Sequence, residues 1–101
     1  MGFVKVASTQ DVSEGRPFCA GANGQKIAIF KVKGRFYALN NKCTHAGGPL
    51  CKGTIDGSVI TCPWHGSKFD VTTGAVVGGP AKKPLQKFEI RVSGTDIEVN
   101  L

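Results

Sequence analysis

The sequence predicts an all-β protein, a small antiparallel sandwich or barrel, and three observations support this prediction. Short apolar stretches that alternate with a period of two recur along the chain, and glycine-containing turn signals separate them. No window of about a dozen residues shows a convincing helical period. The chain has 101 residues, which is the size of one domain with a modest core.

The first part of the chain is expected to contain a strand and a hairpin. Residues 2–8 (GFVKVAS) begin as a strand, and residues 8–15 form at most a single helical turn. Residues 25–32 pair with residues 35–40 across a Lys-Gly turn. Both faces of the first of these strands are apolar, with Ile27 and Ile29 on one face and Ala28, Phe30 and Val32 on the other.

Two further hairpins are expected. Residues 54–61 (TIDGSVIT) turn at Asp56 and Gly57, a dipeptide that favours a type I′ turn because both central residues need positive φ. Residues 85–92 and 95–101 turn at Ser93-Gly94. Their alternation places one set of apolar side chains on a common face: Phe88, Ile90, Val92, Ile97, Val99 and Leu101.

Residues 43–83 depart from this pattern. They are rich in Gly, Pro, Cys and Thr and contain both histidines. We interpret them as loops that are held by something other than a hydrophobic core. The single domain of residues 1–101 is therefore expected to divide into a basal β part, about 1–42 and 84–101, and a loop-rich part, about 43–83.

Each histidine stands beside a cysteine. The pattern is Cys43-x-His45, then sixteen residues, then Cys62-x-x-His65. Two thiolates and two neutral imidazoles suit zinc, and they also suit iron. Structural zinc sites usually take two cysteines from one turn, whereas each turn here supplies one Cys and one His. This favours a dinuclear cluster over a zinc-binding structural module, which stays as an alternative.

The stretches CTHAGGPL and CPWHGSKFD resemble the two cluster-binding loops of Rieske [2Fe–2S] proteins, in which two histidines replace two cysteines on one iron. The similarity extends to the lead-in KGRFYALNN, to the hairpin between the loops and to GGPAKKPL after them. It implies the Rieske fold, in which a small antiparallel β-sandwich or barrel carries an inserted cluster-binding subdomain of two loops.

The resemblance also implies the site. Cys43 and Cys62 would hold the inner iron of one [2Fe–2S] cluster, and His45 and His65 the outer iron. The supporting residues would be Gly47, Gly48, Trp64, Gly66, Ser67 and Pro80. We expect Trp64 to pack on the basal sheet rather than to shield the cluster.

The implied function is that of a soluble one-electron carrier and not of an enzyme. Such a carrier takes electrons from a reductase flavoprotein and passes them to a terminal acceptor such as a Rieske-type oxygenase. The alternative is a small Rieske-like subunit of a nitrite reductase or of another multi-component oxidoreductase.

The remaining cysteines are Cys19 and Cys51. Because the chain shows no secretion signal, its four cysteines favour metal or redox chemistry over a disulfide framework. The disulfide that ties the two loops in respiratory relatives is not expected, since Gly48 and Trp64 occupy the matching positions. Cys19 and Cys51 are expected to be small buried apolar residues.

The formal charge of +6 favours an acidic protein partner over nucleic acid, because no stretch interleaves aromatic and basic residues. Several lysines flank the Cys/His stretches: Lys42, Lys52, Lys68, Lys82 and Lys83. No apolar run is long enough for a membrane span, so we expect a cytoplasmic monomer that does not contact the membrane.

Overall fold

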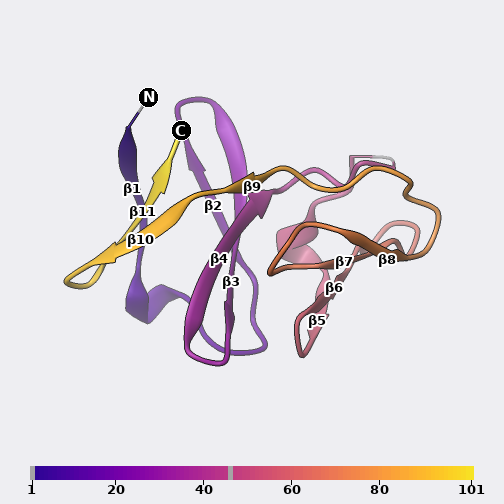
Figure 1. Cartoon of the computed structure of the whole chain (residues 1–101), viewed down its shortest axis with the longest axis horizontal. Coiled ribbons are helices and arrows are strands. Elements are labelled where there is room, and N and C mark those ends of the chain that lie inside the picture. Colours follow the sequence, from indigo (N-terminus) through magenta and orange to yellow (C-terminus); the bar gives the residue numbers. More distant parts are fainter. Residues whose placement is uncertain (1, 46) are drawn as a thin grey trace.

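The computed structural model describes residues 2–45 and 47–101, and these residues form antiparallel sheets with two short 3-10 turns (Figure 1). The strands are β1 (Phe3–Ser8), β2 (Phe18–Ala22), β3 (Gln25–Val32), β4 (Arg35–Asn40), β5 (Thr54–Asp56), β6 (Val59–Thr61), β7 (Lys68–Asp70), β8 (Val76–Gly78), β9 (Lys87–Phe88), β10 (Ile90–Ser93) and β11 (Asp96–Asn100), and the turns are η1 (Thr9–Asp11) and η2 (Leu50–Lys52). The all-β prediction is confirmed. In the described part of the chain, no helix has the length and apolar character that a membrane crossing requires.

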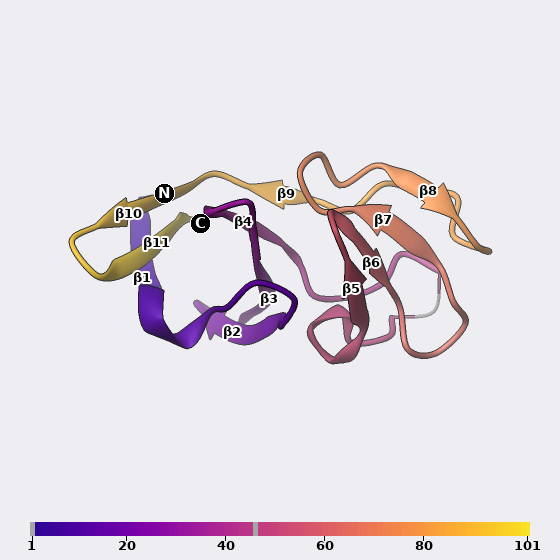
Figure 2. The same cartoon turned by 90° about the horizontal axis from the view of Figure 1, so that it is seen from below.

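The strands make three antiparallel sheets, in the orders β1-β11-β10, β2-β3-β4-β9 and β5-β6-β7-β8. Figure 2 shows the first two sheets curving into a barrel-like ring, with the third sheet beside it. The ring encloses a core to which β1, β3, β4, β9 and β11 contribute. We call this ring the barrel and the third sheet the loop sheet.

Strand β3 connects the barrel to the rest of the molecule. Its Ile27 and Ile29 pack in the barrel core, while Ala28 and Phe30 pack in a second core that includes residues of the loop sheet. The predicted division of its two faces is therefore confirmed. The predicted pairing with β4 is also confirmed, and the turn residues Lys33 and Gly34 have φ of +52° and +80°.

Two predicted turns are wrong by one residue. Asp56 pairs with Val59, so the β5–β6 turn consists of Gly57 and Ser58, and only Gly57 has positive φ. That is the pattern of a type II′ turn rather than the expected type I′ turn. The turn expected at Ser93-Gly94 is shifted in the same way, because Ser93 pairs with Asp96 and Gly94 is the first turn residue.

The predicted strand 85–92 is interrupted. Strand β9 pairs with β4, whereas β10 pairs with β11, so the chain changes sheets at Glu89. The Asn100 backbone N–H donates to the Glu89 carbonyl over 2.9 Å at this crossing. The predicted common face is nevertheless largely confirmed, because Ile90 pairs with Val99 and packs with Phe88 in the barrel core. The exception is Val92, which is 46% exposed.

The hairpin of β2 and β3 was predicted only in part: the sequence indicates a strand at Cys19 and a turn at residues 21–24, but the pairing with residues 25–32 was not expected. Its turn is Asn23 and Gly24, with φ of +52° and +77°, and Ala22 pairs with Gln25. Asn-Gly between two β stretches is a strong hairpin signal, so the sequence did contain the information.

The expectation that residues 43–83 are loops without a hydrophobic core is wrong. This segment contains the whole loop sheet, and its side chains fill the second core together with β3 and β4. The buried members from this segment are Cys43, Leu50, Cys51, Ile60, Cys62, Phe69, Val71 and Ala81. Three-residue strands are short, and so their alternation was hard to see among the glycines.

Gly74, in the turn between β7 and β8, provides a test of how the loop sheet is joined to the barrel. Its φ is +84°, and an added Cβ would lie 2.5 Å from the Leu85 carbonyl oxygen. Gly15 has a similar φ of +75°, but an added Cβ there would meet nothing within 4 Å. Gly15→Ala should therefore cost only the left-handed backbone penalty of about 1–2 kcal/mol.

Gly74→Ala should lower the free energy of unfolding by about 1–3 kcal/mol more than Gly15→Ala, which is the usual cost of overpacking. Urea denaturation followed by circular dichroism measures both variants. Equal destabilisation by the two substitutions would contradict this account of the junction.

Candidate metal centre

The first Cys/His loop leaves β4 and is closed by backbone hydrogen bonds. The Cys43 N–H donates to the Gly48 carbonyl over 2.9 Å, and the Gly47 N–H donates to the Cys43 carbonyl over 2.8 Å. Gly47 has φ of +77°, a conformation that glycine adopts without penalty. The loop therefore turns back on itself and holds Cys43 at its base.

The second loop follows β6 and closes in the same way. The Cys62 N–H donates to the Ser67 carbonyl over 2.8 Å, and the Gly66 N–H donates to the Cys62 carbonyl over 3.2 Å. Gly66 has φ of +78°. In both loops the backbone of the cysteine is thus hydrogen-bonded to the fourth and fifth residues after it. The histidine is the second residue after the cysteine in the first loop and the third in the second loop.

The two kinds of donor differ in exposure. Cys43 and Cys62 are each 3% exposed, whereas His45 and His65 are exposed. The two imidazole centroids are 5.0 Å apart with their planes at 87°. The structure therefore forms two pairs of predicted ligands, a buried pair of neighbouring thiols and an exposed pair of neighbouring imidazoles. Among the described residues, no three His, Cys, Asp or Glu side chains meet at one metal position.

The surroundings of Cys62 act on its thiol in opposite directions. Burial raises the pKa of the Cys62 thiol above its ordinary value, and the neighbouring Cys43 thiol raises this pKa further. The backbone N–H groups of Trp64 and His65 lower the pKa because they donate toward the sulfur. These donors would stabilise a metal-bound thiolate, and binding a metal would release the proton.

A third segment, residues 79–83, binds both loops. The Ala81 N–H donates to Ser67 Oγ over 3.1 Å, and Thr44 Oγ1 donates to the Lys83 carbonyl over 2.6 Å. An added Cβ at Gly79 would lie 2.5 Å from Ser67 Cα. Ser67 is fully buried, and Pro80 lies exposed within this segment. The segment therefore holds the two loops in a common arrangement.

The expectation that Trp64 packs on the basal sheet is wrong, because Trp64 is 57% exposed at the tip of the second loop. A Cβ added to Gly48 would lie 3.1 Å from its indole atoms and 2.7 Å from Cys62 Sγ. The missing side chain at Gly48 thus makes room for both the indole ring and a predicted ligand. The ring bridges the two loops instead of reaching the barrel.

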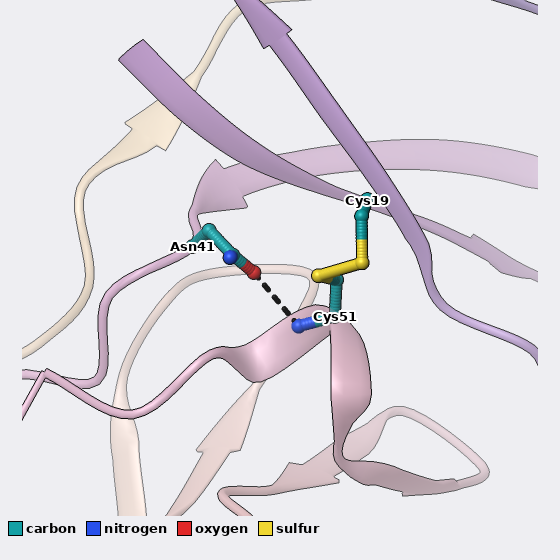
Figure 3. The surroundings of a disulfide bond; sticks show 3 residues. All are labelled: Cys19, Asn41 and Cys51. Carbon is teal, nitrogen blue, oxygen red and sulfur yellow. Dashed lines mark hydrogen bonds between the residues drawn. A yellow bond between two sulfur atoms is a disulfide. The ribbon is translucent and has the colours of Figure 1, made fainter.

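The expectation that Cys19 and Cys51 are small buried apolar residues is also wrong. They form a disulfide that joins β2 to η2, with their Cα atoms 5.0 Å apart (Figure 3). Cys19 is exposed rather than buried, and Cys51 is 7% exposed. The two cysteines are 32 positions apart in the sequence, and only the fold brings β2 beside η2. A usable signal was that exactly these cysteines remain after two are assigned as ligands.

The donor set fits the expected cofactor. Two buried thiols and two exposed imidazoles are the donors that a Rieske centre requires. A sequence profile described as the Rieske [2Fe–2S] domain matches residues 2–89. The chain belongs to the Rieske [2Fe–2S] family.

Individual Rieske proteins resemble the chain over nearly its whole length. The biphenyl dioxygenase ferredoxin subunit of Pseudomonas sp. (strain KKS102) is 39% identical over 101 residues, which cover 99% of this chain and 93% of the relative. The Sphingomonas yanoikuyae B1 ferredoxin superposes with a TM-score of 0.93 at 26% identity, covering 97% of each chain. A solved complex of reduced oxygenase and oxidized ferredoxin in carbazole 1,9a-dioxygenase contains a chain that matches with a TM-score of 0.89 at 35% identity, covering 96% of this chain and 91% of that one.

These similarities confirm the resemblance, the fold and the cofactor that the sequence predicted. The chain is a Rieske ferredoxin, an electron-transfer component and not itself the catalytic enzyme. Its cofactor is a Rieske-type [2Fe–2S] cluster rather than a zinc ion. The assignment of the individual ligands stays a prediction.

Gly48→Ala tests whether the space beside Cys62 Sγ is needed. The added methyl group would crowd Sγ and the indole ring, so we expect a clear loss of iron and sulfide per chain. The matched control is Gly47→Ala, where an added Cβ meets nothing within 4 Å and only the positive φ is strained. Iron and acid-labile sulfide assays, with thermal unfolding in parallel, measure both effects. Full cluster content in Gly48→Ala, or equal loss in both variants, would contradict the proposed crowding.

Proposed function

We propose that this Rieske ferredoxin carries single electrons from a flavoprotein reductase to a terminal oxygenase. Support comes from the similarity to dioxygenase ferredoxin components and from the ferredoxin that resembles this chain in the oxygenase complex. The observation that carries the proposal is the separation of buried thiols from exposed imidazoles at one end of the molecule.

We assign the ligands as the sequence predicted. In this assignment Cys43 and Cys62 would hold the inner iron, and His45 and His65 would hold the outer iron. When bound, the cluster takes up and gives up one electron. The chain positions its thiols through the two closed loops, and residues 79–83 hold these loops together. In this proposal residues 43–83 are the cluster-binding part, and residues 1–42 and 84–101 are the basal part.

The imidazole pair is the route that we propose for electron entry and exit. His45 and His65 are exposed, while both cysteines are almost completely covered. A partner that docks over the histidines therefore approaches the ligands without any rearrangement of the chain. Trp64 lies exposed beside His65 and adds an aromatic surface to the same docking face.

We propose that the docking face is basic and that the partner presents acidic groups to it. Residues 42–83 contain five lysines and two aspartates, and all five lysines are exposed: Lys42, Lys52, Lys68, Lys82 and Lys83. Among the described residues the ion pairs are Lys5–Asp96 and Arg91–Glu98, both in the barrel. Unneutralised lysines would steer an acidic protein to this face.

We further propose that the carrier acts as a monomer in the cytoplasm. The large hydrophobic side chains exposed in residues 2–45 and 47–101 are Trp64, Val77 and Val92. They come from a loop and two different strands, so they do not suggest one large apolar interface.

His65→Cys tests the ligand assignment. A third thiolate makes the cluster more negative, so the midpoint potential should fall and the electron paramagnetic resonance spectrum of the reduced protein should shift. Trp64→Phe is the matched control, since it changes the exposed neighbour and leaves every proposed ligand in place. Redox titration and spectroscopy of both variants make the comparison. A His65→Cys protein with the wild-type spectrum and potential would exclude His65 as a ligand.

Lys82→Glu combined with Lys83→Glu tests the docking face. We expect electron transfer with the native partner to slow at low salt, and the wild-type rate to fall as salt rises, because the Debye length is only about 10 Å at 0.1 M. The midpoint potential should stay almost unchanged.

The matched control is Lys33→Glu with Arg35→Glu. It makes the same charge change at the far end of strand β4, about 17 Å from Asn40 by strand geometry. Stopped-flow rates that are flat with salt, or equal slowing by both double variants, would exclude steering by the docking face.

A further inference from the structure

The Cys19–Cys51 disulfide attaches the first Cys/His loop to the barrel. Cys51 lies in η2, directly after this loop, and Cys19 lies in β2 (Figure 3). Asn41, which precedes the loop, is hydrogen-bonded to η2. Its Oδ1 accepts from the Cys51 N–H over 2.7 Å, and its carbonyl accepts from the Leu50 N–H over 2.8 Å. The entry and the exit of the loop are thus joined to each other, and the disulfide joins the exit to the barrel.

The two cysteines differ in exposure. Cys19 is exposed, whereas Cys51 is 7% exposed and lies in the second core. A surface groove of about 490 Å³ runs along the disulfide. Its lining includes the exposed Lys26 and Lys52 and contains no acidic residue. A small anionic molecule can therefore approach Cys19 in a groove that two positive charges line.

We propose that Cys19–Cys51 is a thiol-exchange site at which an anionic low-molecular-weight thiol opens the bond and loosens the first Cys/His loop. The thiolate attacks Cys19 Sγ, the Cys19–Cys51 bond breaks, and Cys51 leaves as a thiolate that takes a proton from water. A second thiolate attacks the sulfur of the attached thiol and releases Cys19 as a thiolate. Two thiols are oxidised to one disulfide, and the protein disulfide is reduced to two thiols.

Opening the bond changes what holds the loop. The closed bond makes a ring of the chain between Cys19 and Cys51, and this ring contains both Cys43 and His45. Without the bond, the exit of the loop keeps its hydrogen bonds to Asn41 but loses its covalent attachment to β2. The effect on the cluster rests on the proposed ligands Cys43 and His45, whereas the exchange chemistry does not depend on them.

The exchange is tested on the oxidised holoprotein with two probes, the anionic thiol glutathione and the cationic thiol cysteamine. Intact-mass spectrometry follows the mixed disulfide, and peptide mapping locates it. We expect glutathione on Cys19. Lys26→Glu with Lys52→Glu should slow the glutathione reaction by about fivefold or more and should not slow the cysteamine reaction. Lys33→Glu with Arg35→Glu, the same charge change elsewhere, should leave the glutathione rate nearly unchanged.

Glutathione found first on Cys51, no adduct at all, or equal slowing by both pairs of charge changes would overturn the exchange site. This arm measures no cluster property, so it succeeds or fails independently of the ligand assignment.

The effect on the loop is tested with wild type and with Cys19→Ser combined with Cys51→Ser. Hydrogen exchange of residues 47–53 should be faster in the double variant and in the thiol-treated wild type than in the oxidised wild type. Cluster loss to an iron chelator, followed by absorbance, should accelerate by about fivefold or more in the same two samples. This acceleration corresponds to only a part of the stabilisation that a disulfide closing a loop of this length provides. Added thiol should not accelerate cluster loss further in the double variant, which controls for direct attack on the cluster.

Unchanged hydrogen exchange with the bond open would overturn the proposed loosening. Faster exchange without faster cluster loss would instead contradict the ligand assignment to this loop and leave the thiol-exchange site standing.

Discussion

Strand β3 is buried on both faces, and the position of the metal centre depends on this packing. One face of β3 packs in the barrel core and the other packs in the second core with residues of the loop sheet, so the two parts pack against opposite faces of one strand. Each buried aliphatic side chain of this size contributes about 1.5–3 kcal/mol when it is removed from water. The first Cys/His loop starts where β4, the partner of β3, ends, and the second starts where β6 ends. The loops therefore follow strands whose side chains pack in the same core as β3.

The cysteines illustrate how one residue type takes two roles in one small chain. Cys43 and Cys62 are each held by backbone bonds from a glycine four residues later, which leaves their sulfurs free for a metal. Cys19 and Cys51 have no such closed loop around them and meet across two elements. The local backbone, and not burial alone, separates the two pairs, since Cys51 and Cys62 are both largely covered.

Local signals in the sequence were sufficient for three of the hairpins and for the family to which the chain belongs. The alternation of β3 predicted which side chains face each core, and the spacing of Cys43, His45, Cys62 and His65 led to the right family. The two central residues of the β5–β6 and β10–β11 turns were predicted one position too early, because glycine occurs at either the first or the second central position of a hairpin turn. Contacts between distant segments could not be predicted: the Cys19–Cys51 bond, the exposure of Trp64 and the change of sheets at Glu89 all depend on how whole elements pack.

The chain contains one tryptophan, Trp64, and its side chain is largely exposed on the proposed docking face. The indole emission of this protein therefore comes from a single place, between the two loops that hold the predicted ligands. Burial of this ring by an arriving protein makes the surroundings of the indole less polar, and this shifts the emission without any attached dye. The ferredoxin thus carries its own optical probe of an encounter at the proposed docking face.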